Sequence, residues 1–446
     1  MTDNFEPEPK IVFAVSLGCP KNLVDTEVML GALAGNGYEI ASDPDVADII
    51  IVNTCGFISD AVSESRTTIE EMTKICDQKP DALLIVAGCL AEREKENLKA
   101  DFPRIDMLIG TSSYADIAAI IEKRKVSSFA PQTFMHDHTH PRLLATMPWT
   151  AYLKIAEGCS NRCSYCLIPS LRGPLRSREP ESLVREARDL ASIGVRELIV
   201  VAQDITRYGY ERGEKDALAE LLPRLADIDG IHWIRLMYAY PDMIDRKLAK
   251  TIGEIDRVCK YLDMPVQHID DDILKAMNRH GGSDAIRRAV DVLRSEVPGI
   301  SLRTTVIAGF PGETDEQFQR LLRFIEQTGF DRLGAFAYSP EKGTPAAGMS
   351  GIPDEELRNR RRDTIMQVQQ EISLYINREL IGGRVEVLVE DVEETEDGDI
   401  IFSGRSGRDA PHIDGCVYFD GDAEQGDFVC VEIDNADEYD LEGSVI

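Results

Sequence analysis

The sequence predicts an α/β protein of several domains: a parallel α/β domain, a partial (β/α)6 barrel and a small antiparallel β-barrel. Strand-like apolar runs alternate with helical patterns over two long stretches, which favours parallel sheets covered by helices. After residue 377, short alternating runs between Gly and Asp turns replace this pattern, as in a small β-barrel. A chain of 446 residues exceeds one ordinary core. We therefore expect domains at 10–122, 149–375 and 378–446, with a linker at 123–148.

The composition describes a globular chain, with 43% hydrophobic and 29% charged residues. No apolar run is long enough for a transmembrane helix, and the polar segment Met1–Lys10 does not look like a secretory signal. Ten cysteines in such a chain point to metal ligation or reduced thiols rather than to disulfides. The expected compartment is the cytoplasm.

Three cysteines of the first domain each follow an apolar run that reads as a buried strand. The strands are expected at Ile11–Ser16, Asp48–Asn53 and Ala82–Ala87, with a helix at Asn22–Ala34 after the first. Parallel sheets bind ligands beyond the carboxyl ends of their strands, so cysteines in these loops can converge. The alternative is that they serve as small loop hydrophobes. The cysteines are Cys19, Cys55 and Cys89, and the adjoining glycines are Gly18, Gly56 and Gly88.

Residues 124–148 read as a connector, because prolines and serines interrupt any periodic pattern. Its three histidines, His136, His138 and His140, are expected in a solvated loop, and we assign them no role. Two further cysteines are expected in the core: Cys76 inside a helix, and Cys259 just before a strand.

The stretch AEGCSNRCSYC carries the strongest chemical signal in the chain. Cys159, Cys163 and Cys166 form a CxxxCxxC pattern directly after the apolar run Tyr152–Ile155. Three close thiolates can hold three corners of a cuboidal iron–sulfur cluster and leave one iron open. A structural zinc site usually closes its shell with four protein ligands, and no fourth Cys or His follows closely. A zinc knuckle or a chance cluster of cysteines is the alternative.

The middle domain repeats a strand and a helix about six times, and its chemistry is expected at the C-terminal ends of the strands. Polar residues or glycines follow several of these strands. The residues are Gln203, Asp204, Tyr240, Gln267, His268 and the glycine turn Gly309–Gly312. The strands are expected at Tyr152–Ala156, Glu197–Ala202, Trp233–Tyr238, Tyr261–Pro265, Ser301–Ala308 and Arg332–Phe336, with helices between them at Glu181–Ser192, Asp216–Leu225, Ser283–Arg294 and Asp315–Gln327.

Three arginines, Arg172, Arg176 and Arg178, closely follow the CxxxCxxC loop. They can bind a carboxylate through bidentate contacts, or they can be solvated charges before the next helix. His268 can shuttle a proton or be a satisfied strand-end histidine. From Asp354, apolar residues at helical spacing predict a long helix with one buried stripe and an exposed arginine face, closing the barrel.

The CxxxCxxC spacing, with an aromatic residue before its last cysteine, resembles the signature of the radical S-adenosylmethionine (SAM) enzymes. Nearly the whole chain resembles the methylthiotransferases of that group. This resemblance implies a flavodoxin-like N-terminal domain, the radical SAM barrel and a C-terminal TRAM β-barrel. The residues that carry it are SLGCPKNLVDTE (Ser16–Glu27), NTCGFI (Asn53–Ile58), KIAEGCSNRCSYCLIPSLRG (Lys154–Gly173), AQDITRYG (Ala202–Gly209), PVQHIDDDILKAMNR (Pro265–Arg279) and DAPHIDG (Asp409–Gly415).

The resemblance implies two 4Fe-4S clusters, a SAM-binding one at Cys159, Cys163 and Cys166 and an auxiliary one at Cys19, Cys55 and Cys89. We place SAM contacts at Gln203, Gly309 and Gly312. The implied reaction uses one SAM to methylate a sulfur on the auxiliary cluster. A second SAM supplies the radical that removes hydrogen from the β-carbon of an aspartate in small-subunit ribosomal protein twelve. An electron donor and a sulfur donor are required.

Two branches of the family differ in substrate. Members that modify tRNA typically read CQMN where this chain has Cys19-Pro-Lys-Asn22. The net charge is −30, and residues 377–446 contribute −17 of it through 21 Asp and Glu against 4 Arg. An acidic domain attracts a basic protein and repels phosphate. We therefore expect the ribosomal-protein branch and no direct tRNA substrate. The alternatives are a tRNA adenosine methylthiotransferase and a non-catalytic iron–sulfur or zinc-binding electron carrier.

Overall fold

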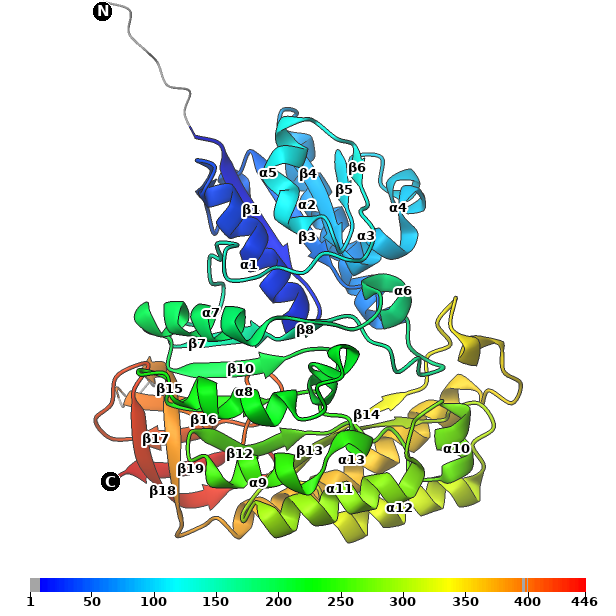
Figure 1. The fold of residues 1–446 in the computed structure, drawn as a ribbon, viewed down its shortest axis with the longest axis vertical. Helices are drawn as coiled ribbons and strands as arrows, with labels where there is room; N and C mark the ends of the chain where they lie inside the picture. The colour runs from blue at the N-terminus through cyan, green and yellow to red at the C-terminus, as the bar shows by residue number, and fades with distance from the viewer. Residues whose placement is uncertain (1–8, 395–397, 399) are drawn as a thin grey trace, which may run out of the picture. The chain divides into compact units, whose positions relative to one another are not determined.

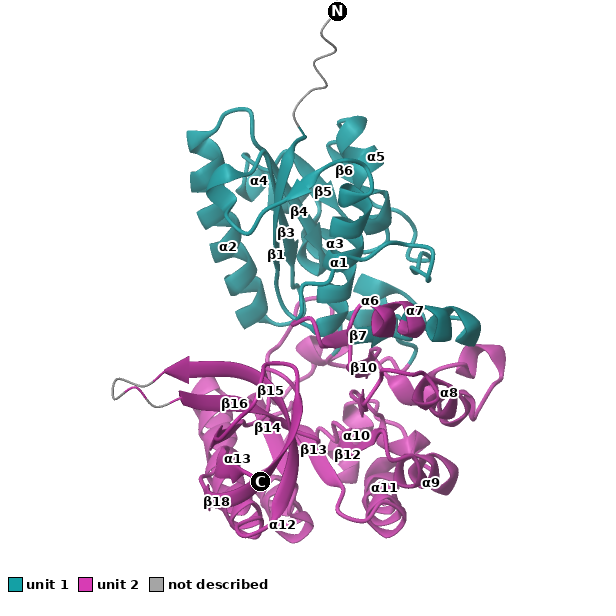
Figure 2. Ribbon diagram, turned by 90° about the vertical axis from the view of Figure 1, so that its left-hand side faces the viewer, with its two compact units in different colours: residues 1–146, 152–160, 166–186 teal, residues 147–151, 161–165, 187–446 magenta. Residues whose placement is uncertain are grey.

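The computed structural model describes residues 9–394, 398 and 400–446, so most of the polar segment Met1–Lys10 lies outside it. The chain forms two compact units (Figure 2). The first contains residues 1–146, 152–160 and 166–186. The second contains residues 147–151, 161–165 and 187–446. None of the described helices is both long and apolar enough to cross a membrane.

The first unit is built on a six-stranded parallel sheet in the order β2-β1-β3-β4-β5-β6 (Figure 1). Alternate residues of the central strand β3 pack in two different cores, one on each face of the sheet. Ile49 and Ile51 pack with α1 and α5, while Ile50 and Val52 pack with α2, α3 and α4. Burial on both faces explains why such a strand reads as a continuous apolar run. The strands are β1 (Ile11–Ser16), β2 (Glu39–Ile40), β3 (Ile49–Thr54), β4 (Leu83–Gly88), β5 (Met107–Ile109) and β6 (Ser127–Ser128), and the helices are α1 (Pro20–Ala34), α2 (Ser59–Gln78), α3 (Cys89–Glu94), α4 (Glu96–Asp101) and α5 (Ile117–Glu122).

The segment predicted as a solvated connector is more structured than expected. Ser127–Ser128 adds the edge strand β6 to the first sheet. His136 is fully buried: its Nδ1 lies 3.3 Å from Tyr114 Oη and its Nε2 3.3 Å from an Arg178 nitrogen. An arginine can only donate, so Nε2 accepts and the ring is neutral, with its proton on Nδ1. The expectation of a solvated His136 was wrong because a buried arginine supplies its partner.

The predicted partial barrel is an open six-stranded sheet in the order β14-β13-β12-β11-β10-β7, whose strands β10 to β14 belong to the second unit. Cys259 lies inside β12 rather than before it and is buried, as is Cys76 in α2. The strands are β7 (Thr150–Lys154), β10 (Glu197–Val201), β11 (Trp233–Leu236), β12 (Val258–Asp263), β13 (Ser301–Ala308) and β14 (Arg332–Ala337), followed in chain order by helices that include α7 (Pro180–Ser192), α8 (Ala217–Ala226), α9 (Arg246–Glu254), α10 (Asp271–Ala276), α11 (Gly282–Glu296) and α12 (Asp315–Thr328).

The long helix α13 (Glu355–Arg378) forms where it was predicted, but its buried stripe is mainly polar. Of the expected apolar positions only Ile365 is fully buried. Arg361 is buried against Glu313, at 2.9 Å, and Gln369 donates to the Phe330 carbonyl oxygen at 2.8 Å. Specific hydrogen bonds, rather than apolar contact alone, fix this helix on the sheet, so the prediction of an exposed arginine face fails at Arg361.

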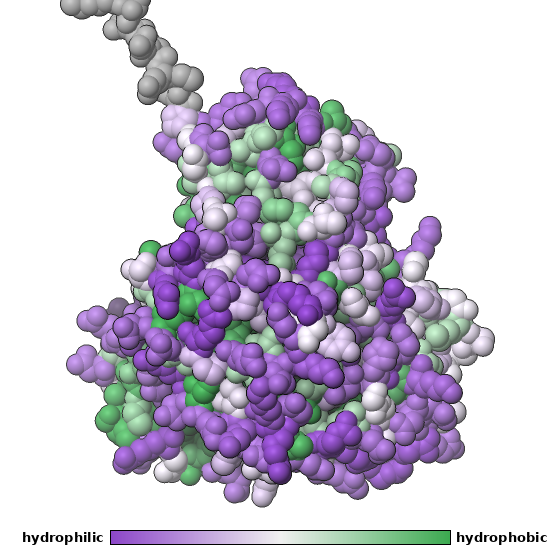
Figure 3. Space-filling model, viewed as in Figure 1, coloured by the Kyte–Doolittle hydropathy of each residue, from purple (hydrophilic) through white to green (hydrophobic). Residues whose placement is uncertain are grey.

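The C-terminal residues form a closed barrel in the order β15-β16-β17-β19-β18. Its core is apolar, and parallel aromatic rings of Phe402 and Phe419 stack 5.7 Å apart inside it. Figure 3 shows that hydrophilic side chains cover most of the visible face of the molecule. The strands are β15 (Arg384–Glu394), β16 (Ile400–Ser406), β17 (Val417–Asp420), β18 (Phe428–Ala436) and β19 (Leu441–Val445).

This barrel is held against the first residues of the sheet strands in the second unit. Arg405 of β16 pairs with Glu197, the first residue of β10, at 2.6 Å. Asp409 pairs with Arg332, the first residue of β14, at 2.8 Å. All four side chains are at most 8% exposed. The barrel therefore covers the N-terminal ends of the strands and leaves their C-terminal ends for chemistry.

Candidate functional site

The structure brings together the three cysteines that follow strands of the first sheet. Cys19 follows β1, Cys55 follows β3 and Cys89 follows β4, and these strands are neighbours in that order. Burial raises the pKa of the Cys55 thiol and that of the Cys89 thiol, the latter to about 12, and the neighbouring thiols add to the rise. Metal is bound by the thiolate form, so these sulfurs need a positive partner to ionise.

Glycines allow the three loops to approach each other closely. Gly18 has φ +86°, and a Cβ there would lie 2.8 Å from Cys55 Sγ. A Cβ on Gly56 would lie 2.9 Å from the carbonyl oxygen of Cys89. Gly88 has φ +91°, and a side chain there would overlap Asn53 Oδ1. Side chains at these positions would force the cysteines apart, so the glycine pattern fits a group held between the loops.

Within residues 9–394, 398 and 400–446, no three His, Cys, Asp or Glu side chains are close enough together to hold one metal ion. A four-iron cluster is larger than one ion, and its ligands stand further apart.

A buried network of four charged side chains adjoins this site. Lys154 and Arg172 each pair with both Asp25 and Glu157. All four side chains are at most 4% exposed. Burial alone would lower the pKa of Lys154, but the two carboxylates raise it above its ordinary value. Two positive and two negative charges balance, as burial of ions requires.

Arg172 also reaches the cysteine site itself. Its Nε donates to Cys89 Sγ at 3.3 Å, and another of its nitrogens donates to Asn22 Oδ1 at 2.9 Å. From the sequence, Arg172 and Arg178 are expected either to bind a carboxylate ligand or to be solvated charges. Both are buried with internal carboxylate partners, Arg178 with Glu186 at 2.5 Å, so neither is a solvated charge. The half-buried Arg176 binds backbone carbonyl oxygens.

The four-charge network was not predicted from the sequence, although one signal for it is present. Lys154 interrupts the apolar run Tyr152–Ile155 on a strand expected to be buried. A buried lysine requires a carboxylate, and the motif holding Glu157 follows it directly. Nothing in the sequence places Asp25, 129 residues away, beside it.

The CxxxCxxC segment forms a loop between β8 (Ala156–Glu157) and the short helix α6 (Ile168–Arg172). Its start is fixed because the Cys159 N–H donates to the Gly173 carbonyl oxygen at 3.1 Å. Its end is fixed because the Ile168 N–H donates to Cys166 Sγ at 3.4 Å. Each of its cysteines is partly exposed, as a site that must admit a cosubstrate requires.

The predicted SAM contacts lie at C-terminal strand ends in the second unit. Gln203 follows β10, and the turn containing Gly309 and Gly312 follows β13. Glu313 shapes this turn, because its carboxylate accepts from the Gly309 N–H at 2.8 Å and the Phe310 N–H at 3.2 Å. A side chain at Gly309 would overlap Arg358 of α13, whereas the space beside Gly312 is open. Helix packing therefore accounts for the first glycine, and only the second leaves room for a ligand.

Two side chains after β12, the buried His268 and the half-buried Gln267, have unused hydrogen-bonding capacity. His268 Nδ1 accepts from the Asp270 N–H at 3.0 Å, which places the proton on Nε2. Burial lowers the pKa of His268 to about 4, so the ring is neutral near pH 7. Its Nε2 and Gln267 Oε1 have no hydrogen-bond partner among the residues that the structure describes. Gln267 also has φ +68°. Such groups at strand ends suit ligand binding better than structural support.

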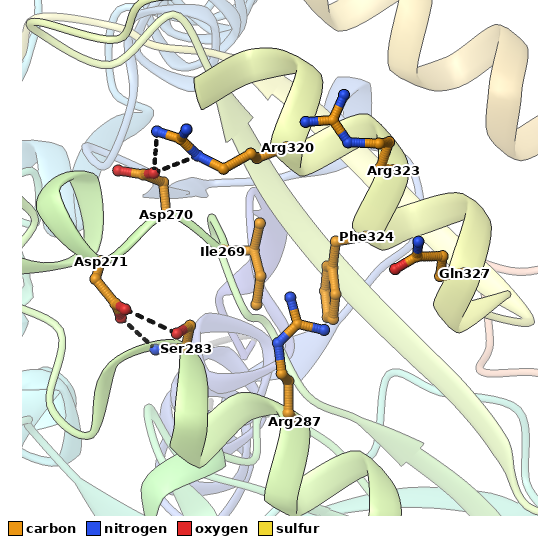
Figure 4. A pocket seen from close by; sticks show the side chains of 9 residues that line it. All are labelled: Ile269, Asp270, Asp271, Ser283, Arg287, Arg320, Arg323, Phe324 and Gln327. Atoms are coloured by element: carbon orange, nitrogen blue, oxygen red, sulfur yellow. Dashed lines mark hydrogen bonds and ion pairs between the residues drawn. The ribbon is translucent and has the colours of Figure 1, made fainter. Parts of the chain in front are cut away.

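Figure 4 shows a separate pocket of about 270 Å³ on the helical side of the sheet. Its carboxylates are already engaged: Asp270 binds Arg320 at 2.7 Å and Asp271 accepts from Ser283. None of the cysteines or predicted SAM contacts lines this pocket. We do not assign the chemistry to it.

Three family descriptions match consecutive stretches of the chain. Uncharacterized protein family UPF0004 matches residues 11–110, the Radical SAM superfamily residues 153–325, and the TRAM domain residues 381–446. The structure of the radical SAM methyltransferase TsrM from Kitasatospora setae is similar, with TM-score 0.58 at 16% identity over 87% of this chain and 79% of that one. The cobalamin-dependent SAM radical enzyme OxsB has TM-score 0.50 at 13% identity, over 82% and 56%. Identities this low show the fold alone.

Together, the partial barrel, the CxxxCxxC loop and the superfamily match define a radical SAM enzyme. Proteins named ribosomal protein uS12 methylthiotransferase RimO align with nearly the whole chain. The one from Geobacter sulfurreducens is 50% identical over 98% of both chains, and the one from Geotalea uraniireducens 49% over 98% of both. The protein from Clostridioides difficile is 47% identical over 97% of this chain and 98% of its own.

The chain belongs to the RimO family of radical SAM methylthiotransferases. It is therefore an enzyme whose cofactors are SAM, the 4Fe-4S cluster of the superfamily and the additional auxiliary cluster of the methylthiotransferases. The electron-carrier alternative is excluded, and the closed barrel of the last domain is the expected TRAM domain.

Proposed function

We propose that this enzyme attaches a methylthio group to the β-carbon of an aspartate in ribosomal protein uS12. The observation that carries the proposal is the alignment of almost the entire chain, at 47–50% identity, with proteins named for that activity. An alignment of this extent includes the C-terminal domain. The acidity of that domain is the feature of the sequence that favours a basic protein over tRNA as the substrate.

We assign the auxiliary cluster to Cys19, Cys55 and Cys89, within a domain at 10–122. We assign the SAM-binding cluster to Cys159, Cys163 and Cys166, within a domain at 149–375 that follows a linker at 123–148. When bound, the clusters and SAM supply the electron, the radical and the sulfur.

The protein's own residues hold and shield these groups. The three loop glycines let the auxiliary ligands converge, and Cys89 is only 7% exposed, so solvent has little access to that side of the site. Gln203, Gly309 and Gly312 are the proposed SAM contacts, of which Gly312 offers open space for a ligand. Shielding from solvent matters because a carbon radical is lost to side reactions when other reactive molecules can reach it.

Substrate recognition is proposed to rest on the acidic surface of the domain at 378–446. Asp409 and Asp414 are not part of it, because they pair internally with Arg332 and Arg303. The acidic side chains that remain exposed attract a basic ribosomal protein over a distance and repel RNA. These residues are Glu379, Glu386, Asp391, Glu393, Glu394, Asp420, Asp422, Glu424, Asp427, Asp434, Asp437 and Glu442.

The same reasoning sets the proposed partners and compartment. A ribosomal protein substrate, free or on the ribosome, places the enzyme in the cytoplasm. Reducing the clusters requires an electron donor, and replacing the transferred sulfur requires a sulfur donor. We propose no membrane partner and no direct tRNA substrate.

The first test compares two substrates. The enzyme is purified without oxygen, its clusters are reconstituted, and SAM and a reductant are added with either uS12 or tRNA. We expect mass spectrometry to find one methylthio group in place of hydrogen on an aspartate of uS12 and no change in the tRNA. A modified adenosine with unchanged uS12 would contradict the proposal.

A second test addresses the ligand assignment. The wild type should bind about eight iron ions per chain, and replacing either set of three cysteines by alanine should leave about four. The matched control replaces Cys76 and Cys259, which lie in the core away from both sets, and should leave the iron content unchanged. Loss of all iron from either triple variant would refute two independent sites.

A further inference from the structure

One short helix of the first unit contacts a proposed ligand of each cluster. At its start, the Ile168 N–H of α6 donates to Cys166 Sγ at 3.4 Å. At its end, Arg172 Nε donates to Cys89 Sγ at 3.3 Å. Leu171 packs on Cys89 between these contacts, and its carbonyl oxygen accepts from Thr111 Oγ1 at 2.6 Å. Within this unit the helix therefore has a fixed position between the two sulfurs.

We propose that Arg172 is a positioning residue that fixes Cys89 and raises the reduction potential of the auxiliary cluster. The inference rests on the proposed function, because it takes Cys89 as a ligand of that cluster. The Arg172 side chain binds Cys89, Asn22 and the carboxylates of the network, so its effect on the reaction passes through Cys89.

The geometry gives Arg172 no freedom to act elsewhere. Its side chain is 2% exposed, and its guanidinium binds Asp25, Glu157 and Asn22 as well as Cys89. A guanidinium cannot lose its proton inside a protein, so the charge is permanent.

The charge has a definite electrostatic consequence. When a cluster accepts an electron from a reductant it becomes more negative by one charge. A positive charge and an N–H···S hydrogen bond both stabilise that reduced form, so the potential rises. The effect is strong here because little water screens it.

The same residue is also part of a balanced ion network, so a simple deletion would confuse two effects. Arg172→Gln leaves Asp25 and Glu157 with one cation, Lys154, and destabilises the fold. The double variant Arg172→Gln/Asp25→Asn removes one positive and one negative charge and keeps the network neutral. If Arg172 has only a structural role, the double variant restores the stability of the fold and leaves the potential of the cluster unchanged. If Arg172 acts on the cluster, the potential remains shifted in the double variant.

The test uses the full-length protein with Cys159, Cys163 and Cys166 replaced by alanine, which leaves the auxiliary cluster alone. Its midpoint potential is measured by dithionite titration followed by electron paramagnetic resonance. We expect a shift to more negative potential in Arg172→Gln/Asp25→Asn and a smaller shift in Arg172→Lys, which keeps the charge without the planar fork. Arg176→Gln is the matched control, because its guanidinium binds only carbonyl oxygens, and should cause no shift.

Each outcome decides one point. An unchanged potential in the double variant, at about four iron ions per chain, overturns the inference while leaving the cluster assignment intact. An equal shift in the Arg176→Gln control also overturns it. An absence of iron in the cysteine background would refute the ligand assignment and with it this inference.

Discussion

The attachment of the C-terminal barrel depends on a buried ion pair that can be tested directly. Arg405 forms charge-assisted hydrogen bonds with Glu197 at 2.6 Å and Glu390 at 2.7 Å, and Glu197 also binds Arg235 at 2.8 Å. Burial alone would raise the pKa of Glu197. The positive charges of Arg405 and Arg235 instead lower this pKa from 4.5 to about 2. This difference corresponds to about 3 kcal/mol of stabilisation, which is similar to the cost of breaking a buried pair.

We predict that Arg405→Met lowers the free energy of local unfolding of the barrel by about 3 kcal/mol. The unfolded segment makes none of the docking contacts, so their loss acts in full. Hydrogen exchange of the β16 and β17 amides should then become about 150-fold faster. The pair also sets a pH dependence: this stability is present above pH 4.5, the ordinary pKa of Glu197, and is lost as the pH falls toward about 2.

The control is Arg384→Met on β15, whose ion pair with Glu432 is 3.7 Å long and exposed. An exposed pair contributes at most about 1 kcal/mol, so exchange should quicken no more than about fivefold. An effect of Arg405→Met as small as that of this control would refute the stabilising role of the buried pair. Additive effects of Arg405→Met and Glu197→Gln in the combined variant would also refute it, because partners in one pair must be coupled.

Three further predictions concern other parts of the chain. Gly18→Ala should abolish iron binding at the auxiliary site. Gly37→Ala is the control, because Gly37 has a similar positive φ but open space around it; this variant should lose only about 1 kcal/mol of stability and keep the iron. Equal iron content in both variants would contradict the close approach of Gly18 to Cys55. Burial, with surrounding positive charge, lowers the pKa of His136 well below 6.5. Because the unfolded chain binds the proton more strongly, stability should fall by about 1.4 kcal/mol from neutral pH to about pH 5.5, and His136→Gln should weaken this pH dependence of the thermal midpoint. Tyr261→Phe removes a 2.8 Å hydrogen bond to Asp414 and should lower the free energy of local unfolding of the C-terminal barrel by about 1–2 kcal/mol. Hydrogen exchange in the barrel should become faster, and an unchanged exchange rate would disprove this.

The sequence was informative wherever the signal is local. The strand limits Ile11–Ser16 and Ser301–Ala308 agree with β1 and β13, because apolar runs in doubly covered parallel sheets have clear ends. The CxxxCxxC spacing is also local, and it identified the superfamily before any contact was known. The position of Cys19 after its strand followed from the same alternation.

Interpretation of individual charges from the sequence was less successful. Arg172, Arg361 and His136 were expected in solvent or beside a ligand, and each is buried with a partner inside its own unit. The sequence does not reveal such partners, because they come from segments far apart in the chain. Arg172 binds Asp25 across 147 positions.

The sequence by itself determined the class of each domain and the family, since these follow from periodicity, spacing and motifs, and the same motifs predict the two cysteine sets. Only the tertiary structure decided which charged side chains are buried together, because the burial of an ion depends on partners that folding brings from elsewhere. It also decided that Asp409 and Asp414 hold the C-terminal barrel to the N-terminal ends of the strands. The sequence counts those two carboxylates with the acidic surface, and only their pairing with Arg332 and Arg303 distinguishes them from it.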